Sequence, residues 1–182
     1  MLRLVTRPAL VIQPDFATEI AAAAKTPLER CIQCAKCSAG CPVGFAMDYL
    51  PNQIIHLVHL GLEDCALGSN SIWLCATCET CTTRCPMEVD LAAVMDALRQ
   101  KARQKAGSRA GGKVGAFHDA FLASVKRFGR AHELSLVGEL KLRTRDFFTD
   151  LGLGLKMFLK GKFGLLPQRI RGVKQVRGTF RH

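Results

Sequence analysis

The sequence predicts a mostly α-helical protein. Apolar residues recur at the spacing of one helix face in several segments, and proline or glycine stands near the ends of most of them. After residue 13, no stretch alternates apolar and polar residues over the length of a strand. With 182 residues and 48% hydrophobic side chains, the chain has the material to bury a core.

The first sixty residues contain two short β-prone runs and two predicted helices. Residues 2–5 and 9–12 have no identifiable strand partner, so we expect them to be extended. Asp15 is a candidate N-cap for an alanine-rich helix over 16–25, which ends before a proline. A second helix begins at Pro51 and continues to a glycine at position 61.

A longer helix is predicted over 91–106, with Asp90 as its N-cap and its apolar residues on one face. The glycine-rich residues 107–112 are typical of a flexible linker. We expect an amphipathic helix over 113–129, whose Phe117, Phe121 and Phe128 form either a core stripe or a partner groove.

Apolar positions within 134–140 and 151–159 predict two more short helices. The last stretch, 160–182, is rich in glycine, and we expect it to run as an extended arm.

Eight of the nine cysteines fall into two runs of identical spacing. The run Cys-x2-Cys-x2-Cys-x3-Cys-Pro begins at Cys31 and is repeated from Cys75. It is the pattern by which bacterial ferredoxins bind [4Fe-4S] clusters. A loop with cysteines at i, i+3 and i+6 can reach three irons of a cubane, and the proline directs the fourth cysteine elsewhere. The sequence therefore predicts two [4Fe-4S] clusters.

In two-cluster ferredoxins the fourth cysteine of each run binds the other cluster. All irons are then bound by the protein, so we expect the clusters to relay electrons, and we expect no catalytic residue in this chain. The predicted ligands are Cys31, Cys34, Cys37 and Cys85 for the first cluster, and Cys75, Cys78, Cys81 and Cys41 for the second.

Structural zinc sites and disulfides are the alternatives for these cysteines. Zinc usually takes two Cys-x2–4-Cys knuckles separated by a dozen residues or more, which these compact runs fit poorly. Disulfides are typical of secreted proteins, and neither a signal peptide nor a transmembrane stretch is recognisable. We therefore expect thiolates bound to iron in the cytoplasm.

Three other residue groups have weaker functional interpretations. The ninth cysteine, Cys65, is interpreted as a small packing residue rather than a ligand. Trp73 belongs in the core or beside a cluster, and both places would bury it. His56 and His59 have a spacing that could bind a metal, but no third ligand is near them in sequence.

The net charge of +11 is divided unequally: residues 1–97 sum to −4 and residues 98–182 to +15. The basic half could bind nucleic acid, a membrane surface or a partner protein. Its cations are spread among large apolar residues and no nucleic-acid motif is present, so we expect partner docking, with peripheral membrane contact as the next alternative.

Outside the cysteines, the segments 46–55 and 71–75 resemble the C subunit of heterodisulfide reductases, and the tail segment 157–167 resembles it loosely. This resemblance implies an α-helical ferredoxin domain over 28–106, after an N-terminal extension over 1–27 and before the linker and a basic docking region over 113–182. It also implies an electron-transfer subunit between a flavin- and iron–sulfur-bearing A-like subunit and a B-like subunit that handles a thiol–disulfide couple at Cys-Cys-Gly motifs.

This chain has no adjacent cysteines and no G-x-G-x-x-G run, so the chemistry is expected on a partner. A relay subunit of a membrane-associated, quinone-linked dehydrogenase is the main alternative function. A cluster-bearing nucleic-acid-binding protein is a third.

Overall fold

The computed structural model describes residues 11–107, 110–145, 152, 156, 160 and 170–180. Within these residues it contains helices and loops and no strand, which confirms the mostly α fold. The helices of the first part are α1 (Phe16–Ala24), η1 (Leu28–Arg30), α2 (Lys36–Ala39), η2 (Gly44–Ala46), α3 (Pro51–His59), α4 (Glu63–Gly68), α5 (Ser71–Leu74), α6 (Thr80–Thr83) and α7 (Leu91–Ala106). The second part contains α8 (Gly112–Phe128), α9 (Glu133–Thr144) and α11 (Val173–Gly178).

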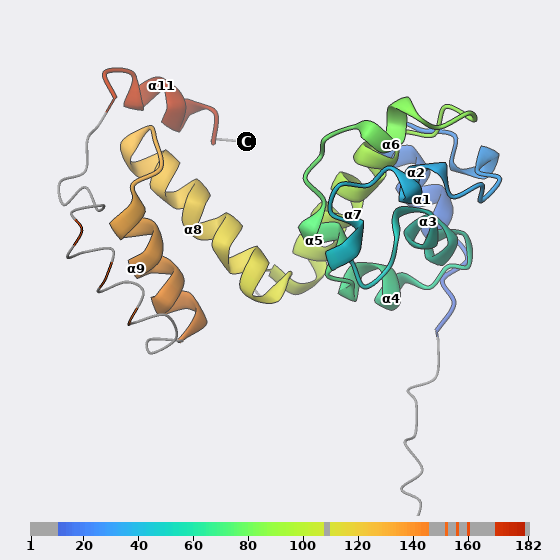
Figure 1. Ribbon diagram of the computed structural model, residues 1–182, viewed down its shortest axis with the longest axis horizontal. Helices are drawn as coiled ribbons and strands as arrows, with labels where there is room; N and C mark the ends of the chain where they lie inside the picture. The colour runs from blue at the N-terminus through green and yellow to red at the C-terminus, as the bar shows by residue number, and fades with distance from the viewer. Residues whose placement is uncertain are drawn as a thin grey trace, which may run out of the picture. The chain divides into compact units, whose positions relative to one another are not determined.

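The chain divides into two compact units, Met1–Gly111 and Gly112–His182. In the first unit, α1, α4 and α5 pack against the long helix α7, and α3 packs against α1 and α4 (Figure 1). Their apolar faces form a core in which Phe16, Ile20, Ile54, Val94 and Leu98 are almost fully buried. Burying apolar surface contributes about 25 cal/mol per Å² to stability. This contribution holds such short helices in place, because isolated helices of this length are barely stable in water.

The predicted helix starts differ in how they are capped. The Asp90 side chain accepts a hydrogen bond from the Ala93 amide at 3.0 Å, which confirms it as the cap of α7. Asp15 occupies the position before α1, but its side chain makes no capping hydrogen bond. Its backbone carbonyl instead accepts from the Glu19 amide, because Asp15 is already in helical conformation. The helix beginning at Pro51 ends at His59, two residues before Gly61.

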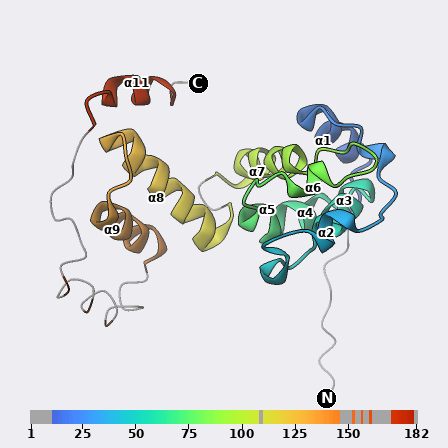
Figure 2. The ribbon, with the colours of Figure 1, turned by 45° about the horizontal axis from the view of Figure 1, so that its top comes forward.

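The second unit is built on α8 and α9, which lie side by side in Figures 1 and 2. Phe128 is buried, whereas Phe117 and Phe121 are 41% and 40% exposed, so the aromatic stripe is only partly core. The Arg143 guanidinium lies 3.6 Å from the Asp119 carboxylate and links the two helices. The predicted helix over 134–140 is confirmed by α9, and that over 151–159 lies outside the described residues apart from 152 and 156.

The expectation of an extended arm is wrong for residues 173–178, which form α11. Arg177 of this helix donates to the carbonyls of Lys126 and Arg127, at 3.1 and 3.2 Å, where α8 leaves its last carbonyls without helical partners. The Ile170 amide donates to the Phe128 carbonyl at 3.3 Å. Tertiary contacts with α8 therefore hold a segment that local sequence alone does not mark as helical.

Residues 2–5 and 9–10 of the predicted N-terminal runs lie outside the described residues, and Val11 and Ile12 have no regular structure. Among the described residues, no helix combines the length and the apolar character that crossing a bilayer requires.

Candidate iron–sulfur centres

The two cysteine runs fold into two copies of one loop. In the first, three cysteines precede or enter α2, and in the second the equivalent three precede or enter α6. Gln33 and Thr77, at equivalent positions, both have positive φ, 55° and 50°. The turns let cysteines three residues apart converge, although a left-handed residue with a side chain costs about 1 kcal/mol. The helices α2 and α6 pack against each other, so the two loops are neighbours.

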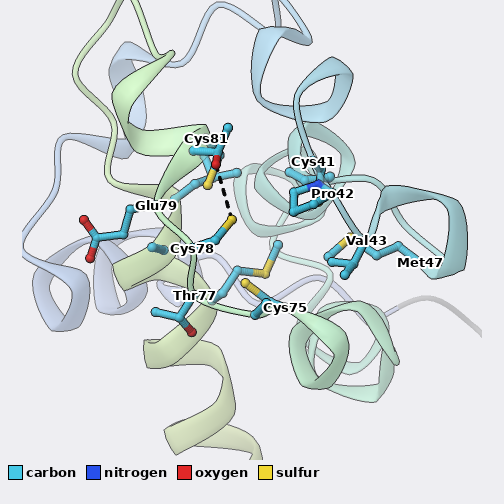
Figure 3. Close-up of a pocket in the computed structure, with 15 residues that line it drawn as sticks. Cys41, Pro42, Val43, Met47, Cys75, Thr77, Cys78, Glu79 and Cys81 are labelled. Atoms are coloured by element: carbon cyan, nitrogen blue, oxygen red, sulfur yellow. Dashed lines mark hydrogen bonds between the residues drawn. The ribbon is translucent and has the colours of Figure 1, made fainter.

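One pocket gathers cysteines from both runs. Cys75, Cys78 and Cys81 line it together with Cys41 from the other loop. Figure 3 shows Cys41 and Pro42 on one side of this space and the three cysteines of the second run on the other. The rest of the lining is largely apolar and includes Met47, Pro51, Leu91, Ala92 and Met95.

A second pocket has the reciprocal composition. Cys31, Cys34 and Cys37 line it with Cys85. Met87 and Val89 provide apolar walls, and the Val89 amide donates to the Cys85 Sγ at 3.3 Å. Each pocket thus holds three cysteines of one run and the fourth of the other, with Met47 and Met87 beside the fourth cysteines.

The Leu91 side chain lines both pockets and is 2% exposed. It is the first residue of α7, directly after the Asp90 cap. The two pockets therefore share a wall residue, and they are neighbours in the fold.

Equivalent hydroxyl groups tie each loop to the helix that follows. The Ser38 hydroxyl donates to the Asn52 Oδ1 and accepts from the Asn52 amide at 3.0 Å. The Thr82 hydroxyl donates to the Asp90 Oδ1 at 2.9 Å. Asn52 and Asp90 are at the starts of α3 and α7, so the first turn of each helix fixes one loop.

The loop between the runs is pinned by Asp48. Its carboxylate accepts from the amides of Tyr49, Asn70 and Ser71 and from the Ser71 hydroxyl. Burial alone would raise the pKa of Asp48, but the hydrogen bonds, led by that of the Ser71 hydroxyl, outweigh it and lower the pKa. This charge-assisted network anchors the segment after Cys41 to the start of α5.

The thiols differ in their surroundings. Burial raises the pKa of Cys37 and of Cys81 above the ordinary thiol value, whereas the hydrogen bond with the Thr80 hydroxyl lowers the pKa of Cys78. Iron bound at these buried positions would favour the thiolate, because a metal deprotonates a coordinating thiol.

These residues fit a pair of [4Fe-4S] clusters. All nine cysteines are free of disulfides, and each pocket offers four sulfur donors in mainly apolar surroundings. Among the described residues, no group of three or more His, Cys, Asp or Glu side chains is placed to hold a single metal ion. When bound, a cubane gains or loses one electron without breaking ligand bonds.

The remaining candidates lie apart from the pockets. Cys65 is half-buried on α4 and lines neither pocket. Trp73 is buried, with the Arg103 guanidinium 5.1 Å from its ring centre. The His59 Nε2 lies 2.9 Å from the Leu28 carbonyl, a structural contact, and His56 is exposed. Sequence reasoning missed Arg99 of α7, which donates to the loop of the second run.

Comparison with known proteins shows what the cysteine-bearing part of the chain is similar to. Residues 27–89 match the family described as 4Fe-4S dicluster domain. The chain is 37% identical over 91 residues to the C subunit of the H(2):CoB-CoM heterodisulfide,ferredoxin reductase of Methanothermobacter thermautotrophicus, covering 50% of this chain and 49% of the relative. It is 34% identical over 99 residues to the second iron-sulfur C subunit of the CoB–CoM heterodisulfide reductase of Methanocaldococcus jannaschii, covering 50% and 53%.

A third relative is the C subunit of the ferredoxin:CoB-CoM heterodisulfide reductase of Methanosarcina acetivorans, which is 41% identical over 75 residues, 41% of this chain and 30% of the relative. The chain thus spans about half the length, or less, of these relatives. The matches confirm the resemblance to the C subunit of heterodisulfide reductases, which are oxidoreductase complexes, and they confirm two [4Fe-4S] clusters as the cofactors.

Proposed function

Because residues 27–89 match a 4Fe-4S dicluster domain, we propose that this chain is the electron-transfer subunit of a heterodisulfide-reductase-like complex. It relays electrons through its two clusters between a flavin- and iron–sulfur-bearing A-like subunit and a B-like subunit whose Cys-Cys-Gly motifs handle a thiol–disulfide couple. The chain itself carries no catalytic residue in this proposal. The free cysteines support a reducing, cytoplasmic location.

The observation that carries the proposal is the gathering of eight cysteines into two pockets of four. We propose Cys31, Cys34, Cys37 and Cys85 as ligands of the first cluster, and Cys75, Cys78, Cys81 and Cys41 as ligands of the second. All four corners of each cubane are then bound by protein, which favours relay over substrate binding. The two pockets share Leu91 in their walls, and this neighbourhood supports exchange of electrons from one cluster to the other.

The basic region over 113–182 is proposed as the part that docks on other subunits. Its net positive charge would complement anionic, thiolate-bound clusters on an iron–sulfur partner. Large apolar side chains are also exposed on α8 and α9, among them Phe117, Phe121, Leu122, Val137 and Leu142. Exposed apolar groups with cations around them are typical of a protein interface.

The test is co-purification of the tagged chain from its native cells, with iron and sulfide analysis. We expect about eight irons and eight sulfides per chain, and stoichiometric recovery of a Cys-Cys-Gly protein with a flavoprotein. Recovery in the membrane fraction with a quinone-reactive subunit would support the dehydrogenase alternative instead. Salt-sensitive retention of DNA or RNA would support the nucleic-acid alternative.

A further inference from the structure

Arg99 of α7 contacts the loop that carries the second cysteine run. Its Nη2 donates to the Cys75 carbonyl at 3.3 Å and to the Thr77 Oγ1 at 3.1 Å. Only 18% of the Arg99 side chain is exposed, and its Nη1 lies 3.8 Å from the Asp96 carboxylate. The residue one helical turn earlier, Met95, lines the pocket of Cys75. A guanidinium is thus held beside this pocket.

One donor of Arg99 is left over. Its Nε is buried and, within the part of the chain that the structure describes, has no hydrogen-bond acceptor. A buried donor without an acceptor costs about 1–3 kcal/mol, and the charge of arginine cannot be removed by deprotonation. Arg99 therefore brings a cation with one unsatisfied donor to the side of the second pocket. An anionic cluster next to the loop would compensate it.

The cation beside the first loop is of a different kind: the Arg84 side chain packs against Gly40, and Arg84 is exposed, so that solvent screens its charge. The position that corresponds to Arg99 in the repeat is Ile55, which is fully buried. Neutral amides serve the first loop instead: the Gln33 Nε2 donates to the Cys31 Sγ at 3.6 Å, and the Asn52 amide group donates to the Gln33 side chain at 3.3 Å. The two pockets therefore share their cysteine arrangement and differ in their electrostatics.

Other charges near the pockets act more weakly. Lys36 lines the first pocket and Glu79 the second, but both are exposed, so solvent and salt screen them. Asp90 faces the second loop through Thr82, and its charge is compensated by the start of α7, including the Ala93 amide. Arg99 is the half-buried charge that directly holds a cysteine segment.

We propose that Arg99 is a positioning residue that fixes the Cys75–Thr77 segment and raises the reduction potential of the second cluster. Reduction adds an electron to an already anionic centre, and a nearby cation in a poorly hydrated site stabilises the reduced form more than the oxidised one. This inference rests on the ligand set proposed above. Electron transfer to a partner is not needed to test it.

The test is a potentiometric titration of the purified holo-chain, followed by electron paramagnetic resonance. The signal of the second cluster is identified as the one that Cys78→Ser removes. Arg99→Gln removes the positive charge. Arg99→Lys keeps the positive charge but lacks the planar guanidinium with its several N–H donors. Lys101→Gln is the matched control, because it also removes one positive charge from α7. The Lys101 side chain is 19% exposed, close to the value for Arg99, and it pairs with Glu19 of α1 and not with the cysteine loop.

We expect Arg99→Gln to lower the midpoint potential of the second cluster and to leave that of the first unchanged, with Arg99→Lys close to wild type and Lys101→Gln without effect. An unchanged potential in Arg99→Gln, or an equal fall in Lys101→Gln, would overturn the proposal. The Arg99→Gln variant could fail to hold the second cluster. In that case the proposal is supported if Arg99→Lys retains this cluster with a near-wild-type potential. It is overturned if both variants lose the cluster. A wild-type chain with no second-cluster signal would instead refute the ligand set.

Discussion

Ala35 and Glu79 have the same left-handed backbone conformation, with φ of 58° for both and ψ of 8° and 6°. Each immediately precedes the short helix that carries the third cysteine of its run, α2 or α6. Neither is a glycine, although this region of φ and ψ disfavours side chains. The two runs therefore repeat the same strained backbone conformation as well as the same cysteine spacing. This conformation lets the sulfurs of each loop come together.

Substitutions at Glu79 should follow this backbone requirement. Glu79→Gly should leave the free energy of unfolding unchanged or raise it by up to about 1 kcal/mol. Relief of the left-handed strain in the folded chain offsets the greater conformational freedom that glycine gives the unfolded chain. Glu79→Val should destabilise by about 1 kcal/mol or more and weaken retention of the second cluster. Glu79→Gln controls for charge and should behave as wild type. Equal stability of the valine and glutamine variants would contradict the prediction.

The reciprocal grouping of cysteines predicts which signal each ligand affects. Cys41→Ser should perturb the cluster of Cys75, Cys78 and Cys81 and leave most of the other signal in electron paramagnetic resonance. Cys65→Ser makes the same chemical change outside both pockets and should leave both signals intact. Loss of the cluster of Cys31, Cys34 and Cys37 in the Cys41 variant would show that the ligands are not exchanged.

Leu91, which lines both pockets, should be costly to truncate. Leu91→Ala leaves a cavity at a fully buried position and should reduce the free energy of unfolding by about 2–4 kcal/mol. Leu60→Ala, at a position 45% exposed, should cost less than about 1 kcal/mol. Chemical denaturation of the two holo-variants measures the difference. Similar values for the two would mean that Leu91 is not part of the packed wall.

The Asp48 network predicts a pH dependence of stability. The pKa of Asp48 is lower in the folded chain, so its contribution is complete above the unfolded-state pKa and is lost as the pH falls through the folded-state pKa. Asp48→Asn should destabilise by about 1 kcal/mol near neutral pH and flatten the acid side of the stability curve. Asp15→Asn is the control, since the Asp15 side chain makes no capping hydrogen bond. Parallel acid curves for wild type and Asp48→Asn would refute the role of Asp48.

Local signals in the sequence predict much of the fold. Asp90 followed by an apolar stripe predicts α7, and the spacing of Val114, Phe117 and Phe128 predicts α8. The structure assigns α11 where the sequence indicates an extended arm, because Arg177 binds carbonyls about fifty residues away. Phe117 has the same periodicity as Phe128, but α9 covers only part of that face, so periodicity alone overestimates its burial.

The centres show the same division between local and long-range information. Cysteine spacing is a local signal, and it predicts the eight cysteines among the residues that line the two pockets. Arg99 has no such signal, since one cation on a basic, amphipathic helix is indistinguishable from its exposed neighbours until the helix is packed. A weak indication is its position one turn after Met95 on the apolar face of α7.

The exchange of Cys41 and Cys85 between the pockets has a consequence for biosynthesis. Neither cysteine run supplies all four sulfurs of one pocket. Neither pocket is therefore complete while only the first run has left the ribosome. If Cys85 is a ligand as proposed, the first site would be completed only once Cys85 has been synthesised, and by then all four cysteines of the second pocket are present as well. With the ligands proposed above, both sites would gain their last cysteines within one short stretch of synthesis, Cys81 to Cys85, and a chain truncated before that stretch would expose thiols of both runs.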